Sequence, residues 1–157
     1  IRTIPTPVFV GAINAMGASA TPMNFGEVYT SMQSGVLDGF EHTASTTLSF
    51  KFHEIAKYMA TTQHLIDPTV VAFSNTEWKK LDTKEQAVVL EGAKLATDIA
   101  RAMSSVREAE SLAQLKKLGM TITYPDMAEA HAKAVGVQKE MAAKLKADDL
   151  LQQILAP

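Results

Sequence analysis

The stretch Pro22–His42, PMNFGEVYTSMQSGVLDGFEH, combines a helix start, a helix, a glycine turn and an apolar strand in one short run. It predicts a helix over Phe25–Ser34, with Asn24 as the N-cap and Glu27 as the third residue of a capping box. The segment Val36–Glu41 is predicted to be a mostly buried strand. Polar groups follow this strand, at the edge where open α/β sheets bind their ligands.

Strands and helices alternate on both sides of this run, which is typical of an α/β fold. Further strands are expected at Ile1–Ile4, Ala18–Thr21, Ala56–Leu65, Thr69–Phe73 and Met120–Tyr124. Further helices are expected at Val8–Met16, Thr47–His53 and Thr83–Leu118, and after Asp126 and Glu129, with a break at Ala147–Asp149.

The helix predicted over Thr83–Leu118 is unusually long. The capping-box pattern Asp82–Glu85 opens it, and a second such pattern, Ser74–Glu77, precedes it. About 36 residues at 1.5 Å each give a rod of roughly 54 Å, longer than a compact domain of this size. Such a helix must extend beyond its own domain or lie against a second one.

Composition limits the classes of function. The chain has 157 residues, of which 46% are hydrophobic and 20% charged, so it can build a core. The net charge of −2 does not favour binding of nucleic acid, whose partners usually carry a basic surface. Without cysteine there are no disulfides and no thiolate sites. The sequence shows no membrane span and no signal peptide, and its start at Ile1 predicts that an N-terminal part is missing.

Four residues near the predicted strand ends are candidates for a site. Arg2 lies in an apolar strand. Composition alone favours a position at an exposed edge of the sheet. The alternative is that its planar guanidinium clamps a ligand carboxylate. His42 is either a structural histidine or a ligand contact. Phe25 and Phe40 belong to the core or line a ligand.

Enzyme and metal motifs are weak. His53 and Glu54 continue as Ile-Ala-Lys, which does not complete the helical two-histidine zinc pattern. There is no Gly-x-Ser-x-Gly elbow. A hydrolase-like enzyme that uses His42 or His53 remains an alternative, as does a helical interaction module built on Thr83–Leu118. No cofactor and no metal are expected.

Several motifs together resemble the C-terminal half of DctP-type solute-binding proteins, which serve tripartite ATP-independent periplasmic (TRAP) transporters. The matching segments are Ile1–Thr3, Gly17–Ala18, Thr21–Tyr29, Met32–Gly39, Lys51–Tyr58 and Thr62–His64. Beyond about residue 80 the resemblance continues as a layout of a long helix, a strand, Pro125-Asp126 and closing helices.

The resemblance implies a periplasmic-binding-protein-like α/β fold of class II, a two-lobed clamshell. This chain would be mainly the second lobe plus the long inter-lobe helix. Residues 1–68 would belong to the second lobe, residues 69–107 would cross to a missing first lobe, and residues 108–157 would return.

The resemblance also implies a periplasmic binding protein rather than an enzyme. It would capture a small organic carboxylate, such as a dicarboxylate, and deliver it to the membrane permease. Its other partner would be the missing N-terminal lobe, and nucleic acid is not expected as a partner. Apolar surface left uncovered on the chain is expected to promote self-association.

Site residues follow from the same resemblance. Arg2 would pair with the substrate carboxylate, Phe25 would line the ligand, and Thr6 lies on a loop near the ligand. His42 replaces an asparagine that many members have, and Phe40 replaces a glutamine. An imidazole is larger than a carboxamide and can charge near neutral pH, so His42 is expected to set ligand specificity.

Overall fold

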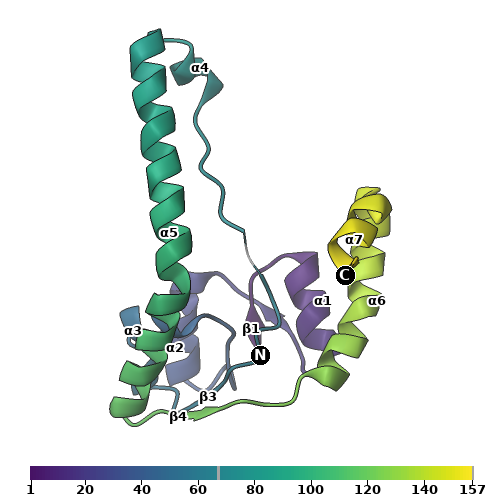
Figure 1. Ribbon diagram of the computed structural model, residues 1–157. Coiled ribbons are helices and arrows are strands. Elements are labelled where there is room, and N and C mark those ends of the chain that lie inside the picture. The colour runs from purple at the N-terminus through teal and green to yellow at the C-terminus, as the bar shows by residue number, and fades with distance from the viewer. Residues whose placement is uncertain (67, 157) are drawn as a thin grey trace.

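The computed structural model describes residues 1–66 and 68–156. Along the chain these form β1 (Arg2–Thr3), α1 (Pro7–Ala15), β2 (Thr21–Pro22), η1 (Phe25–Glu27), α2 (Val28–Gln33), α3 (Ala44–Ser49), η2 (Phe52–Glu54), β3 (Tyr58–Ala60), α4 (Asn75–Trp78), α5 (Thr83–Lys117), β4 (Thr121–Thr123), α6 (Ala128–Leu145) and α7 (Asp148–Leu155). Figure 1 shows a small mixed body, with α5 extending far beyond it on one side and α6 and α7 on the other. The predicted α/β class is confirmed.

Two short parallel sheets form the centre of the body. β1 pairs with β2, so that Arg2 lies opposite Thr21, and an isolated bridge joins Arg2 to Phe40 on the other side. β3 pairs with β4, so that Met59 lies opposite Ile122. Parallel neighbours need a long connection, which α1 provides in the first sheet and α5 in the second.

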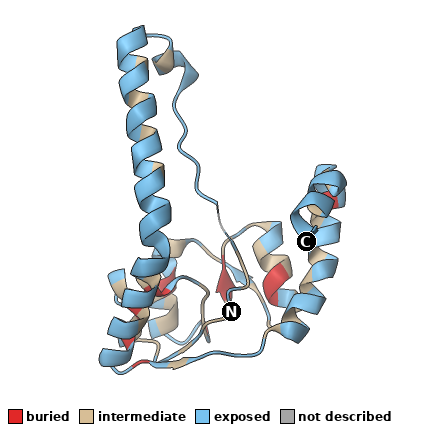
Figure 2. Cartoon of the chain, in the orientation of Figure 1, coloured by how far each residue is buried: buried red, intermediate tan, exposed pale blue. Residues whose placement is uncertain are grey.

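Two small apolar clusters hold this body together. Val28, Leu37 and Phe52 form one of them, between α2 and η2. The other joins α3 to the end of α5 and the start of β4, through Ala44, Leu115 and Met120. Figure 2 shows that buried residues gather in the body, whereas the distal half of α5 is almost entirely exposed.

The long helix and its cap are confirmed. The Asp82 carboxylate accepts hydrogen bonds from the amides of Lys84 and Glu85, and the Glu85 side chain accepts one from the Asp82 amide. α5 then runs for 35 residues. Its apolar side chains stay exposed along most of its length, at Val88, Leu90, Leu95, Ile99 and Val106. Within the described residues, no helix is both long and apolar enough to cross a membrane.

The strand predicted at Val36–Glu41 is wrong, apart from the bridge at Phe40. The amides of Val36 and Leu37 both donate to the carbonyl of Ser31, at 2.9 and 3.2 Å. These bonds continue the turn that ends α2 and leave the amides unavailable to a neighbouring strand. Val36 is consequently 71% exposed and only Leu37 is buried.

The other strand predictions are partly right. Residues 69–73 are extended but form no strand, because no described strand lies beside them, and Val70 is 79% exposed. The strand expected over Ala56–Leu65 shrinks to β3, since only its three residues face β4. The strand expected at Ala18–Thr21 is displaced to β2.

Two helix ends differ from the prediction because another local hydrogen bond or backbone conformation replaces the expected one. Asn24 does not cap the next turn; its side-chain amide donates instead to the Glu27 carboxylate at 3.3 Å. The helix expected over Thr47–His53 starts earlier, at Ala44, and ends before Lys51, whose φ of 57° is left-handed. The break expected at Ala147–Asp149 is present but lies slightly earlier, at Lys146 and Ala147, because Lys146 is left-handed and α7 already begins at Asp148.

Candidate functional site

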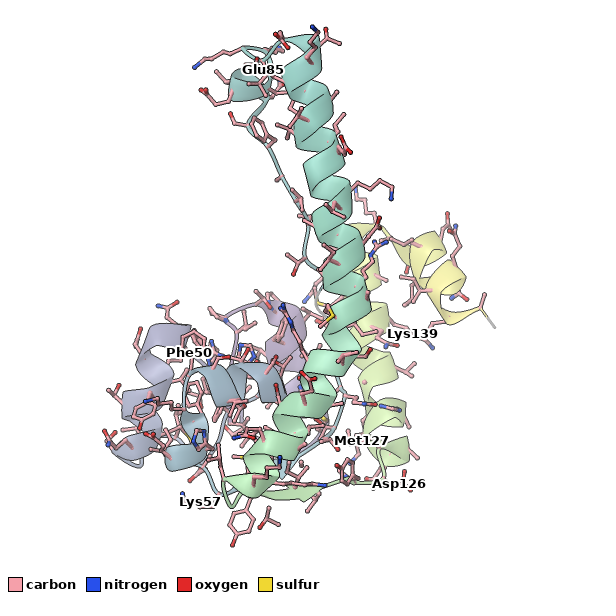
Figure 3. The ribbon with its side chains drawn as sticks, turned by 60° about the vertical axis from the view of Figure 1, so that its left-hand side comes forward. Phe50, Lys57, Glu85, Asp126, Met127 and Lys139 are labelled. Atoms are coloured by element: carbon pink, nitrogen blue, oxygen red, sulfur yellow. The ribbon has the colours of Figure 1, made fainter. Side chains whose placement is uncertain are left out.

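An aromatic cluster lies between η1, α3 and η2. The ring of Phe25 meets three others edge-on, with centroid distances of 5.2 Å to His42, 4.9 Å to Phe50 and 5.8 Å to Phe52. The ring of Phe40 lies 4.4 Å from that of Phe52. Phe50 projects from the surface of the body in Figure 3, far from Glu85 at the distal end of α5. The cluster therefore belongs to the body, away from the distal end of α5.

Arg2 is buried beside this cluster. Its side chain rises from β1, and the residue is only 2% exposed. Its Nε donates to the Met23 carbonyl at 2.9 Å, and its guanidinium carbon lies 5.8 Å from the Phe25 ring centre. Its Nη1 is buried and has no hydrogen-bond partner among the described residues. The exposed-edge interpretation of Arg2 is thus wrong, and its Nη1 has no partner in the part of the chain that the structure describes.

Burial lowers the pKa of Arg2, because removing water disfavours its charged form, and the nearby Glu41 carboxylate opposes this effect. An arginine still keeps its charge at neutral pH. The site therefore holds a cation that is incompletely paired.

Glu41 and His42 follow the bridge to Arg2. The Glu41 amide donates to the Arg2 carbonyl at 3.3 Å, and its carboxylate accepts a bond from the Thr3 hydroxyl at 3.2 Å. The Nδ1 of His42 accepts a hydrogen bond from the Thr43 amide at 3.0 Å. Since a backbone amide can only donate, Nδ1 is the acceptor nitrogen of His42 in this bond.

Thr6 occupies the position before α1, on the loop that follows β1. Its hydroxyl oxygen is buried and lacks a hydrogen-bond partner among the described residues. Ring contacts and backbone pairing thus bring Arg2, Phe25, Phe40 and His42 together. Thr6 is linked to them through β1.

A cavity of about 280 Å³ adjoins Phe40 and His42 on the side of β3. Its walls are largely apolar, and its polar lining includes Glu41, Thr62 and His64. The Nδ1 of His64 lies 2.6 Å from the Thr62 hydroxyl, while its Nε2 is buried without a partner among the described residues. Burial lowers the pKa of His64.

Sequence reasoning did not select Glu41 or His64 as site residues. The sequence did contain a signal for both residues: each follows a segment that pairs in a sheet, and polar side chains collect at that edge of the sheet. Among the described residues there is no cluster of three or more potential metal ligands from histidine, cysteine or carboxylates.

The chain matches known proteins over most of its length. The model of the DctP family, "Bacterial extracellular solute-binding protein, family 7", matches residues 1–145. The sialic acid-binding periplasmic protein SiaP of Vibrio cholerae is 33% identical over 111 residues, which cover 71% of this chain and 35% of that protein. A solute-binding protein of Roseobacter denitrificans is 34% identical over 134 residues, 85% of this chain and 41% of that protein.

Solved structures of solute-binding proteins also resemble this chain. A TRAP periplasmic solute-binding protein of Pseudomonas putida F1 with bound D-glucuronate matches with a TM-score of 0.90 and 32% identity, over 99% of this chain and 50% of that one. One from Sulfitobacter with bound β-D-galacturonate matches with a TM-score of 0.88 and 34% identity, over 96% and 51%. The expected periplasmic-binding-protein-like fold is confirmed, and this chain spans about half the length of those proteins.

Proposed function

Because this chain belongs to the DctP family of bacterial extracellular solute-binding proteins, we propose that it forms about half of the solute-binding subunit of a TRAP transporter. The protein captures a small organic carboxylate in the periplasm and delivers it to the membrane permease. The observation that carries this proposal is the buried Arg2, whose Nη1 lacks a partner among the described residues while its guanidinium lies over the ring of Phe25.

The arrangement around Arg2 suits a carboxylate in particular. The guanidinium is held from one side by the Met23 carbonyl and from its face by Phe25, so its orientation is fixed before the ligand arrives. A ligand carboxylate would accept from Nη1 at little cost in ordering the side chain. The Thr6 hydroxyl adds a further polar group for the rest of the ligand.

Sugar acids are the first ligands to test. Two structural relatives are described with bound D-glucuronate and β-D-galacturonate. In this chain, Phe40 and the edge-on pair of Phe25 and His42 give the site a strongly aromatic wall. We therefore expect a carboxylate whose body has an apolar face, and a uronate is one such molecule.

The long helix fits a protein with two lobes. Residues 1–68 and 108–157 form the second lobe in this proposal, and residues 69–107 cross to a first lobe. That first lobe would cover the exposed apolar residues of distal α5, such as Leu95 and Ile99. Without it, the same surface is expected to drive self-association, which sedimentation of the isolated chain would detect as a concentration-dependent mass.

Two alternatives have less support. A hydrolase that uses His42 or His53 would need a paired nucleophile, and the family to which the chain belongs is one of solute-binding proteins. A helical interaction module built on α5 alone ignores the buried Leu115, by which the helix packs into the body.

Isothermal titration of the full-length protein with D-glucuronate tests the proposal. We expect binding by the natural protein and a loss of at least about 100-fold in affinity for Arg2→Ala, which removes a charged hydrogen bond and leaves the anion unpaired. Arg101→Ala removes the same charge from the exposed surface of α5 and is the matched control. Equal affinity in the Arg2→Ala and natural proteins would disprove the clamp.

A further inference from the structure

Two aromatic rings from one short segment contact Phe25. Phe50 is the C-cap of α3, and Phe52 is the first residue of η2. The ring of Phe50 lies 4.9 Å from that of Phe25 at an interplanar angle of 86°, and the ring of Phe52 lies 5.8 Å away at 67°. Both are edge-on contacts, which aromatic pairs favour. Phe25 is thus held on two sides by residues that are only two positions apart.

The residue between these two rings has a left-handed backbone. Lys51 has φ 57° and ψ 26°, a conformation that is uncommon for residues other than glycine because Cβ comes too close to a carbonyl oxygen. Among the described residues, Gln63 and Lys146 are the other non-glycine residues with positive φ. Such a conformation persists where the surrounding contacts determine it, and it often marks a functional site.

The left-handed residue ends one helix and begins the next. The Lys51 amide donates to the Leu48 carbonyl at 3.1 Å, which closes α3, and the Lys51 carbonyl accepts from the Glu54 amide at 3.0 Å, which starts η2. If α3 simply continued, side chains two positions apart would point about 200° away from each other. The turn at Lys51 therefore lets Phe50 and Phe52 face the same ring.

The segments on both sides of this turn are anchored in the body. Glu108 on α5 accepts hydrogen bonds from the amides of Ala44, at 2.8 Å, and Ser45, at 3.2 Å, and so fixes the start of α3. On the other side, Phe52 is 2% exposed and belongs to the core. With both flanks fixed, the conformation of the turn decides where Phe50 points.

We propose that Lys51 is a positioning residue for the ligand site, and that it acts through its left-handed backbone. The turn holds Phe50 and Phe52 against Phe25, and Phe25 in turn lies 5.8 Å from the guanidinium carbon of Arg2. Phe50 acts by its place rather than by its burial, because it is 57% exposed. The effect on ligand affinity rests on the proposed function, whereas the placement of the Phe25 ring does not.

Two substitutions at Lys51 separate its backbone from its side chain. The test is titration calorimetry of the full-length protein with D-glucuronate. Lys51→Val introduces a β-branched residue, which disfavours the left-handed region, and should bind about tenfold more weakly. Lys51→Gly loses the lysine side chain but adopts positive φ readily, so it should bind as the natural protein does. An equal loss in Lys51→Gly, or no loss in Lys51→Val, would overturn the proposal.

Lys146→Val is the matched control. Lys146 has the same left-handed conformation, with φ 54°, at the end of α6. Its valine variant should lose stability in urea unfolding as Lys51→Val does, yet keep its affinity for D-glucuronate. If both variants lost affinity equally, general instability would explain the result and the proposal would be wrong. Phe50→Ala keeps the turn and should also bind more weakly; it decides the question if Lys51→Val does not fold.

NMR of the Phe25 ring provides a measurement that needs no ligand. Neighbouring aromatic rings shift the ring signals of Phe25, and a Phe25→Leu protein assigns them. We expect these signals to move in Lys51→Val and to stay unchanged in Lys51→Gly and Lys146→Val. Unmoved signals in Lys51→Val would contradict the role of the turn. If the natural protein binds no carboxylate, the proposed function fails, and the ring signals alone decide the role of Lys51.

Discussion

The guanidinium carbon of Arg2 lies 5.8 Å from the centre of the Phe25 ring, and the Nε of the same arginine donates to the backbone carbonyl of Met23 two residues before that ring. One short segment therefore provides both the aromatic face and the acceptor that orient the cation. The guanidinium is held on its face and at Nε, and Nη1 is left over. A planar fork is needed for all of these roles.

Replacing Arg2 by lysine should therefore fail to preserve the site. Lysine keeps the charge but has a single donor nitrogen in place of the fork, so it cannot bond the Met23 carbonyl and a ligand in the same geometry. We expect uronate affinity to fall by roughly 10- to 100-fold, corresponding to one or two hydrogen bonds to charged groups. Calorimetry of the full-length protein measures this, with Arg101→Lys as the control. Full affinity in Arg2→Lys would show that charge alone suffices.

Removing the Phe25 ring should weaken the fold as well as the site. Phe25 contacts the rings of His42, Phe50 and Phe52. For Phe25→Ala we expect a loss of about 2 kcal/mol in the free energy of unfolding, somewhat below the range for a fully buried ring because Phe25 is half-buried. Phe50→Ala should lose under about 1 kcal/mol, since Phe50 is 57% exposed. Urea unfolding measures both, and equal losses would contradict the central place of Phe25.

The cap of α5 should be worth a measurable part of the stability of that helix. Asp82→Ala removes the acceptor for the amides of Lys84 and Glu85. Replacement of such a cap costs about 1 kcal/mol, and the loss should be local because distal α5 has little packing. Hydrogen exchange should therefore accelerate in the first turns of α5. Ser74→Ala is the comparison, with a smaller expected effect because the bond to the Glu77 amide is 3.5 Å long. Unchanged exchange in Asp82→Ala would contradict the role of the cap.

His64 should make stability depend on pH. Burial lowers its pKa in the folded protein below the usual value of about 6.5, so the unfolded chain binds the proton more readily. Its contribution to stability is complete above about pH 6.5 and is lost as the pH falls towards the lower folded value. The melting temperature should drop between pH 7.5 and 5.5, and His64→Gln should reduce that drop. A variant with the pH dependence of the natural protein would show that His64 is not responsible.

Helices were the more predictable part of this fold because their signals are local. Asp82 and Glu85 bond to each other within one turn, and the sequence pattern alone identifies them. A strand depends on a partner elsewhere in the chain. Val36 has the composition of a strand residue, yet its amide is used by Ser31, and the β-branched residues 69–71 have no described neighbour with which to pair.

The candidate site also has a part that the sequence predicts and a part that only the fold reveals. Arg2 could be selected from its resemblance to a family motif, but its burial depends on Gly39, whose carbonyl accepts from the Arg2 amide, and on the bridge to Phe40. Glu108 carries no signal in the sequence, since it is one of many charged residues on a long helix. Its role is visible only where the fold brings it to the amides of α3.

The pairing of β3 with β4 also closes a long loop during folding. Met59 and Thr123, which are bonded across these strands, are 64 positions apart, and all of α5 lies between them. Closing a loop of this length costs chain entropy before the hydrogen bonds between β3 and β4 can form, so this pairing is expected to form slowly. Until the loop closes, residues 58–60 present an unpaired strand edge, which is a template for pairing with another chain.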